Sequence, residues 1–470
     1  MRNFVLAPEA LVVATAVVVV LAGRFGWLPR SARLYLPQAT AVIVLVALGV
    51  ELWAGAVLSS YFGGAIIQDR FALFVKAAAL LTAAVALAAT DWSSEDSLHF
   101  GLAMPLLAAF GAMVAASAGD LLGLWAGLEL AGAAGVVLVS LRRPDLALRL
   151  LVVGGIASAL LLVGFAFLYA NIGNPDLTAI RAALTNHQAT IVLAIPVLLL
   201  LSGLAVRAGV APFHVGTLPV GLGASPLGAG LIIGLVAVAA AIVALKLAAA
   251  LLPVPEVYAP YAQVVAALAM VGGGAAALAV RSPRPRMAYL AVSQAGWIAA
   301  GLSTHFQAGI AGSLFLLGAF AVAATCGPAV LGRAEGGEPA IHGFGAVRPV
   351  RAAGLALAML SLAGAPPLAG FFGELAVGAA LAQSGNYALI GLGALGSVLG
   401  VAAALGTLRV MFIQSPLEET RRGAAAALPA VTMFSTIGSV ALCLVVAGYG
   451  VFGFPIMGLA TQGAEALGLR

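Results

Sequence analysis

Four ionisable residues stand inside long apolar stretches of the sequence, where a charge is unexpected: Glu129, Arg207, Lys246 and Glu374. An ionisable residue at the centre of a membrane-spanning helix costs about 2.5–3.5 kcal/mol on insertion scales, so each one needs a functional or structural reason. The chemistry that suits these groups is proton transfer, because a carboxyl group beside a cation changes its protonation when its partner moves. We therefore predict a proton path through these four residues.

Each of these residues also has a simpler structural interpretation. Glu129 and Arg207 can form a static buried ion pair. Lys246 can extend its ammonium group to the membrane surface, because a proline follows about two turns later. Glu374 can be a surface residue at the start of a loop. His214 is either a titratable relay or a histidine bonded to backbone groups, and both interpretations stay open.

The composition identifies the environment of these charges. Of the 470 residues, 63% are apolar and 8% are charged, whereas a soluble domain has about 25% charged residues. This excludes soluble enzymes, disordered chains and nucleic-acid-binding modules, and it predicts an all-α polytopic membrane protein. Cys326 and Cys443 lie far apart in apolar runs, so we expect no disulfide, metal or iron–sulfur site in the chain.

The elements that must position these residues are membrane-spanning helices of about 20 residues. Fourteen segments qualify: 4–23, 37–58, 71–90, 99–118, 120–141, 146–170, 190–210, 226–252, 258–280, 286–303, 306–331, 349–372, 386–413 and 426–451. A run of β-branched and aromatic residues over Val57–Ile67 predicts a small hairpin. Glu51 and Lys76 lie near segment ends, where we expect them at the membrane interface.

Two of the fourteen segments are interrupted in a related way. The interruptions contain Pro212 in the seventh segment, between Arg207 and His214, and Pro366 and Pro367 in the twelfth, before Glu374. Such paired interruptions predict broken helices that line a path at mid-membrane, and their odd offset of five segments predicts two inverted five-helix repeats. We expect N-terminal helices over 1–118, a first repeat region over 119–257, a second over 258–414, and a C-terminal loop with the last helix over 415–470.

Basic residues predict the orientation. Fifteen lie in the odd-numbered connections and five on the opposite side. Because cytoplasmic connections carry the excess of basic residues, both termini are expected outside. The Gly391–Gly396 stretch matches the GxGxxG pattern of dinucleotide-binding folds, but it lies within an apolar segment without a preceding strand, so we interpret it as helix packing.

The order of the motifs resembles the antiporter-like membrane subunits of respiratory complex I. The similarity covers about Ser60 to Phe412, and the Pro-Pro-Leu-Ala-Gly-Phe-Phe-Gly string is most similar to the subunit N branch of that family. It rests on the segment that contains Glu129 and on Leu146–Leu150, Gly154–Ser158, Ala211–His214, Arg281–Trp297 and Gly364–Gly373.

The resemblance implies a fourteen-helix subunit with two inverted repeats that translocates protons. It implies that partner subunits, which carry FMN, iron–sulfur clusters and quinone, oxidise NADH and reduce the quinone. By position, it implies these roles: Glu129 as the fifth-helix glutamate, Arg207 in place of the seventh-helix lysine, Val236 in place of the eighth-helix lysine, Glu374 in place of the twelfth-helix lysine, Gln294 in place of a tenth-helix histidine, His214 as the histidine after the first break, and Arg149 as the basic residue that opens the sixth helix.

Three functions follow as hypotheses. The first is a non-redox membrane-arm subunit of a proton-translocating NADH-quinone oxidoreductase in the bacterial inner membrane. The second is a subunit of a multi-subunit cation/proton antiporter. The third is a structural subunit that does not conduct, which the departures at Arg207 and Val236 favour. In the first case the partners are the other membrane-arm subunits and lipid, with no nucleic acid and no cofactor in this chain.

Overall fold

The computed structural model describes residues 5–27, 29, 33–54, 58–92, 97–185, 191–332, 341–413 and 432–468. Helices dominate these ranges. They are α1 (Ala7–Phe25), α3 (Leu36–Ala54), α4 (Arg70–Ala89), α5 (Leu98–Ser117), α6 (Leu121–Ser140), α7 (Pro144–Ile172), α8 (Leu177–Thr185), α9 (Ile191–Ala208), α10 (Leu218–Gly223), α11 (Pro226–Leu231), α12 (Ala237–Ala250), α13 (Pro255–Ala279), α14 (Pro283–Leu302), α15 (Gln307–Leu331), α16 (Phe344–Val347), α17 (Pro349–Leu362), α18 (Ala369–Gln383), α19 (Tyr387–Leu408), α21 (Met433–Val451) and α22 (Gly453–Ala466).

Each of the fourteen predicted segments contains a helix. Among the described residues, eleven helices are long and apolar enough to cross a membrane, or twelve if the pair Leu193–Ala208 and Phe213–Gly223, bent by 46°, counts as one span. The chain is therefore a polytopic helical membrane protein. The C-terminal edge of the twelfth segment was predicted wrongly, because a helix resumes at Ala369 and continues to Gln383. Residues 426–431 of the last segment lie outside the described residues.

The predicted hairpin is confirmed. Strands β1 (Ser59–Tyr61) and β2 (Ile66–Gln68) pair antiparallel, with Ser59 opposite Gln68. The hairpin packs against the end of α5, since a Cβ atom on Gly119 would lie 1.9 Å from the Gly64 carbonyl oxygen. Only a glycine fits this close approach. Residue 57 of the predicted hairpin is outside the described ranges.

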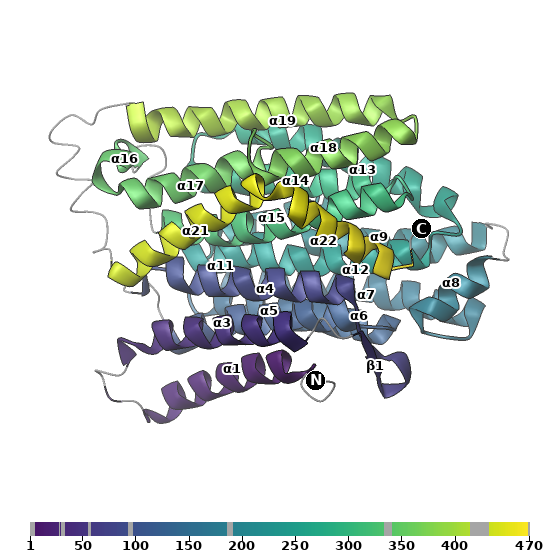
Figure 1. Cartoon of the computed structure of the whole chain (residues 1–470), viewed down its shortest axis with the longest axis horizontal. Helices are drawn as coiled ribbons and strands as arrows, with labels where there is room; N and C mark the ends of the chain where they lie inside the picture. Colours follow the sequence, from purple (N-terminus) through teal and green to yellow (C-terminus); the bar gives the residue numbers. More distant parts are fainter. Residues whose placement is uncertain are drawn as a thin grey trace.

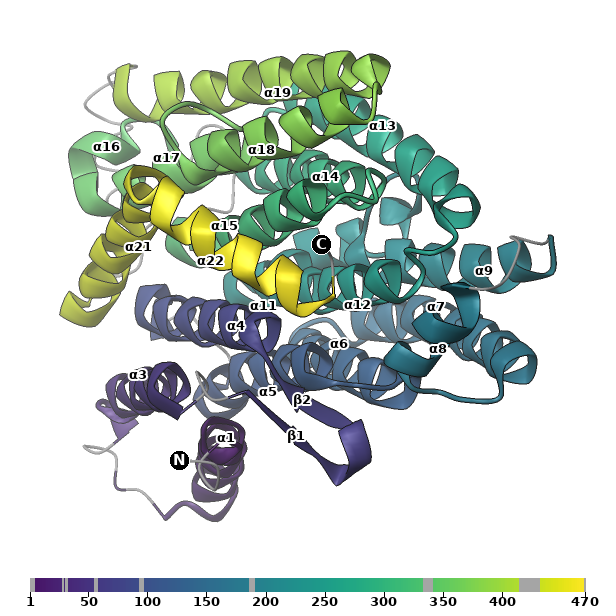
Figure 2. The same cartoon turned by 45° about the vertical axis from the view of Figure 1, so that its right-hand side comes forward.

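The helices lie side by side with their long axes roughly parallel (Figure 1). The N-terminal helices α1 and α3 form one end of the assembly, α13 and α19 form the other, and α15 is buried between them along its apolar length. Figure 2 shows the hairpin projecting from the N-terminal part, and α22, which was not predicted, crossing α15 and α4. The interior is mostly alanine and leucine. Membrane-spanning helices associate through close van der Waals packing, because the hydrophobic effect does not drive them together in lipid.

Glycines bring two helix pairs into close contact. In the first pair, a Cβ atom on Gly127 of α6 would lie 2.6 Å from the carbonyl oxygen of Gly111 in α5. In the second pair, a Cβ atom on Gly274 of α13 would lie 2.4 Å from the carbonyl oxygen of Gly396 in α19. Gly396 belongs to the GxGxxG match, and all of that match lies within α19. This confirms that the pattern serves helix packing.

Two aspartates set the start of helices that carry site residues. Asp69 accepts a hydrogen bond from the Ala72 amide at 2.7 Å and begins α4. Asp120 accepts one from the Gly123 amide at 2.6 Å and begins α6. Each carboxylate satisfies a backbone donor that has no partner within its helix.

Candidate functional site

The first polar group joins three helices and is partly buried. Glu129 of α6 forms an ion pair with Arg207 of α9, and Ser158 of α7 lies between them. The Arg207 Nη2 atom donates to Ser158 Oγ at 2.7 Å, and the same hydroxyl contacts Glu129 Oε1. The structure therefore brings together two residues that are 78 positions apart in sequence.

Two glycines make room for the guanidinium group of Arg207. A Cβ atom on Gly132 of α6 would lie 2.3 Å from Nη1, and one on Gly154 of α7 would lie 3.0 Å from the same atom. The group is therefore held in a slot between α6 and α7 that any larger residue would narrow. The Arg207 side chain is 9% exposed and that of Glu129 is 32% exposed, so the carboxyl group reaches the edge of the assembly.

Arg207 also borders two small cavities. One, of about 20 Å³, lies between Arg207 and α14, where Ala288 and Val292 line it. Such a volume holds about one water molecule. The other, of about 10 Å³, is lined by Arg207 and Val236. Val236 ends a π-helical turn, Ile232–Val236, between α11 and α12, so this turn faces the arginine across the cavity.

The chain leaves the helix at both predicted interruptions, and it does so in the same way. Gly209 has φ +63° after α9 and Gly364 has φ +73° after α17. The next amide donates back five residues in each case, from Val210 to the Ala205 carbonyl and from Ala365 to that of Leu360. These are the hydrogen bonds of a left-handed helix cap. A proline follows each glycine by three residues, Pro212 in the first case and Pro367 in the second.

His214 and Arg149 lie at the first interruption rather than in the ion pair. His214 is in a 3₁₀ turn, Phe213–Val215, and its ring meets the edge of the Tyr289 ring of α14 at 6.1 Å between centroids. Its Nδ1 atom is buried without a hydrogen-bond partner in the described part of the chain. Arg149 of α7 donates to the Val215 carbonyl at 3.1 Å and so holds this turn.

The second polar group surrounds Glu374 of α18. The carboxyl group is 7% exposed, so the alternative of a surface residue in a loop is wrong. Ser397 of α19 donates to Glu374 Oε2 at 2.7 Å and accepts from the Trp297 indole at 3.0 Å. The Gln294 amide of α14, oriented by its hydrogen bonds, donates to Glu374 Oε1 at 3.0 Å. The structure thus brings Gln294 and Glu374 together.

An apolar groove of about 530 Å³ leads to this second group. Glu374 and Ser397 lie in it, together with Pro366, Phe371 and Trp297. Pro366 and Pro367 occupy the interruption just before α18, and Pro366 places this interruption against the groove.

Lys246 does not join either group. Its ammonium donates to the carbonyl oxygens of Ala116 and Ala118, at 2.5 and 2.6 Å, where α5 ends. A cation at the C-terminus of a helix satisfies free carbonyl groups and opposes the negative end of the helix dipole. Arg286 and Arg351 make similar contacts at the ends of α13 and α15. The lysine lies within the protein rather than at its surface.

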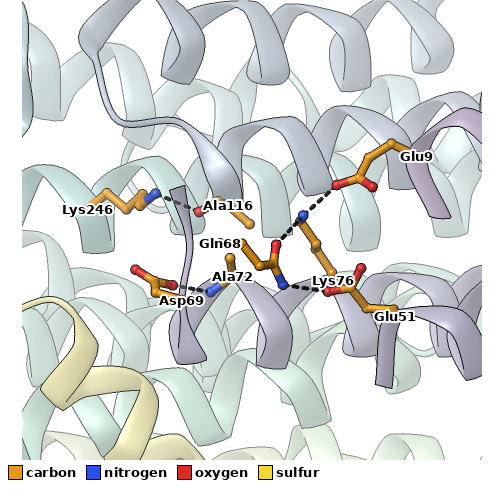
Figure 3. A network of polar contacts seen from close by, with 8 residues as sticks. All are labelled: Glu9, Glu51, Gln68, Asp69, Ala72, Lys76, Ala116 and Lys246. Atoms are coloured by element: carbon orange, nitrogen blue, oxygen red, sulfur yellow. Dashed lines mark hydrogen bonds and ion pairs between the residues drawn. The ribbon is translucent and has the colours of Figure 1, made fainter. Parts of the chain in front are cut away.

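A third polar group was missed by the sequence analysis (Figure 3). Lys76 of α4 forms an ion pair with Glu9 of α1 and donates to the Gln68 amide oxygen at 2.6 Å. The Gln68 amide nitrogen donates to Glu51 of α3 at 2.8 Å. Glu51 and Lys76 were expected at the interface, and both are instead fully buried. The signal was present in Glu9, a single acidic residue in the first turn of an apolar helix.

Comparisons with known proteins identify a family and a fold for this chain. The transmembrane family described as NADH:quinone oxidoreductase/Mrp antiporter matches residues 118–400. NADH-quinone oxidoreductase subunit N of Granulibacter bethesdensis is 32% identical, with 99% of each chain covered. A chain of respiratory complex I from Thermus thermophilus superposes with a TM-score of 0.79 at 24% identity, covering 97% of this chain and 99% of its own. A chain of the Mrp complex from Dietzia superposes with a TM-score of 0.79 at 19% identity, covering 98% and 97%.

Proposed function

Because the chain belongs to the NADH:quinone oxidoreductase/Mrp antiporter transmembrane family, we propose that it is a membrane-arm subunit of a complex I-type NADH-quinone oxidoreductase. In this role it contributes to proton translocation and carries no redox centre. The observation that carries the proposal is the match to subunit N over 99% of each chain, combined with a hydrogen-bonded carboxyl group near each interruption.

The first group acts as a carboxyl–cation switch. Arginine keeps its charge because its pKa is above about 12, so the proton that moves is on Glu129 and not on Arg207. When Glu129 is ionised, Ser158 and the guanidinium hold it. When it takes a proton, the attraction is lost and the guanidinium is free to turn toward the cavity beside α14.

Helix α14 connects this switch to the second group. It lines the cavity next to Arg207, its Tyr289 meets His214, and its Gln294 bonds Glu374. A water in the cavity provides the first step of the path. At the far end, Ser397 accepts from Trp297 and donates to Glu374, so one hydrogen-bonded chain orients the carboxyl group. Lys246 acts on this path only through its charge.

The repeat organisation is part of the proposal. Fourteen membrane-spanning segments arise if three crossings are added to the eleven long apolar helices. These three are the bent pair that begins with α9, the single helix α14, and the pair of α17 with α18. The two interruptions share their left-handed glycine and their backbone hydrogen bonds. One polar contact joins the fifth and seventh segments and another joins the tenth and twelfth, which supports inverted repeats over 119–257 and 258–414 with an offset of five.

We place the chain in the bacterial inner membrane, with both termini on the outer side. The excess of basic residues in the odd-numbered connections supports this orientation. The start of α1 and the end of α22 also lie toward the same side, next to the hairpin and α8 respectively. The partners are other membrane-arm subunits and lipid, and FMN, iron–sulfur clusters and quinone belong to partner subunits.

A second candidate is a subunit of a multi-subunit cation/proton antiporter. The family description includes Mrp antiporters, and the Dietzia Mrp chain has the same fold over 98% of this chain. The two functions differ in their driving force, because complex I uses NADH oxidation and an antiporter uses an ion gradient. The same switch serves both.

The test begins with the native assembly. A tag on this chain is expected to recover a complex with NADH-quinone oxidoreductase activity. In inverted membrane vesicles, Glu129→Gln and Glu374→Gln should each abolish NADH-driven proton uptake, while Glu256→Gln, at an exposed position on α13, should leave it unchanged. Recovery of a complex that exchanges cations for protons without NADH would favour the antiporter, and unchanged pumping in both variants would favour a structural subunit.

A further inference from the structure

The third polar group lies outside the part of the chain that matches the family, which is residues 118–400. Four elements contribute to it: α1 provides Glu9, α3 provides Glu51, β2 provides Gln68 and α4 provides Lys76 (Figure 3). Glu9 is 8% exposed and Gln68 is 1% exposed, and Glu51 and Lys76 are fully buried. A cluster of charges so far from solvent has to be close to neutral, because an unpaired buried charge is strongly unfavourable.

The hydrogen bonds leave the cluster with two unused acceptors. Lys76 is paired with Glu9 and donates to Gln68, which in turn donates to one oxygen of Glu51. The second oxygen, Oε2, of Glu9 and that of Glu51 are both buried without a hydrogen-bond partner in the described ranges. A protonated carboxyl group carries a hydrogen on one oxygen and is no longer charged, so it suits such a position.

The charges do not balance when both carboxyl groups are ionised. Glu9 and Glu51 supply two negative charges, Lys76 supplies one positive charge, and Gln68 is neutral. From this count we propose that Glu9 and Glu51 share one bound proton beside Lys76 and form a proton-binding site in the N-terminal helices. The proton bonds to a carboxylate oxygen of either glutamate, and Lys76 stays positively charged and neutralises the other.

Charges on the neighbouring elements that the structure describes do not remove this need. Asp69 and Lys246 lie near the cluster, on the far side of Gln68, and line one cavity together, so their charges offset each other. His99 lies at the opposite end of α5, beside Gly23, and Glu465 of α22 accepts a hydrogen bond from Gln307. The described parts of α15 and α21, which also pack against α4, carry no charged residue.

The cavity that Asp69 and Lys246 line is separated from the cluster by the backbone of β2. It has a volume of about 190 Å³, and Ile67 and Asp69 line it on either side of Gln68 in the sequence. The Gln68 side chain points to the other face of the strand, where its amide joins Lys76 to Glu51. Gln68 is the last residue of β2, so the cluster lies where the hairpin joins α4.

The test counts protonated carboxyl groups by infrared difference spectroscopy of the intact complex in lipid. Glu9→Gln and Glu51→Gln should each lose the infrared band of one protonated carboxyl group relative to the parent. In each variant the remaining glutamate is ionised, because its negative charge is neutralised by the positive charge of Lys76. Lys76→Met should gain one group, because both carboxyl groups must then be neutral. The double variant with Glu9→Gln and Lys76→Met should match the parent, with one proton on Glu51. Glu374 contributes equally to all spectra and cancels.

Glu256→Gln serves as the control for an exposed carboxyl group and should not change the band. The inference fails if both single glutamine variants keep the parent band, or if Lys76→Met adds no protonated group. If Lys76→Met alone does not assemble, the double variant still tests the number of protonated carboxyl groups, because it should show the same band as the parent. This test is independent of the proposed function, because the number of protonated carboxyl groups depends only on charge and burial. Loss of pumping in Glu129→Gln tests the proposed function, and loss of the band in Glu51→Gln tests the proton-binding site.

Discussion

The glycine slot around Arg207 gives a prediction whose size follows from distances. Gly132→Ala places a Cβ atom 2.3 Å from Arg207 Nη1, where ordinary contact begins at 3.4 Å. The guanidinium must therefore move by about 1 Å, and Gly154 limits its retreat toward α7. A shift of that size away from α6 separates Nη2 from Glu129, which lies on the same helix as Gly132, and so weakens the charge-assisted hydrogen bond of the ion pair.

The energetic consequence is a difference between two similar substitutions. A hydrogen bond to a charged group is worth about 1.5–3 kcal/mol, and alanine in place of glycine recovers up to about 1 kcal/mol in a helix. Gly132→Ala should therefore destabilise the protein by about 0.5–2 kcal/mol. Gly135→Ala, one turn along α6, meets only Val236 at 3.5 Å and Ile232 at 3.7 Å and should be neutral or stabilising.

The assay is thermal unfolding of the complex in lipid nanodiscs, followed by NADH-driven proton uptake in vesicles. Gly132→Ala should unfold at a lower temperature than Gly135→Ala and should pump more slowly, because the switch has lost its geometry. Equal melting temperatures and equal pumping in the two variants would refute the argument that this slot positions Arg207.

Three further predictions use other contacts. Ser397→Ala removes the donor at 2.7 Å from Glu374 and should slow proton uptake while leaving the assembly intact, as gel filtration would show. Gly274→Ala should destabilise the α13–α19 contact by about 1–3 kcal/mol through overcrowding, whereas Gly272→Ala, which faces open space, should not lower the melting temperature. Asp120→Ala removes the N-terminal cap of α6 and should cost about 0.5–2 kcal/mol in the same melting assay.

Much of the fold was predictable because the local signals are strong. Apolar runs of membrane length have to be helical, since a spanning segment must satisfy its own backbone hydrogen bonds. The interruptions at Pro212 and Pro367 were visible because glycine and proline end helices. By contrast, α22 went unpredicted, because it is short, begins close to the end of α21 and contains Pro455.

The site was predictable in part. An ion pair of Glu129 and Arg207 was one of the two interpretations given for these residues, because both are costly within a membrane and each needs a partner. The contact between Gln294 and Glu374 was not predicted, because the two residues come from different helices and no local pattern pairs them. The placement of Lys246 was left open, because nothing local shows that the carbonyl groups at the end of α5 lie within its reach.

By itself, the sequence determined that the chain is a helical membrane protein, where its helices are interrupted and which of its few charges need an explanation. These properties depend on runs of neighbouring residues and on the cost of a charge in lipid. Only the tertiary structure decided which charges meet. Glu9, Glu51 and Lys76 come from three helices and meet through Gln68 of the hairpin, and no local pattern encodes that meeting. Helix neighbours are chosen by the fit of small residues across long sequence separations, so the partners of a buried charge are a property of the packing.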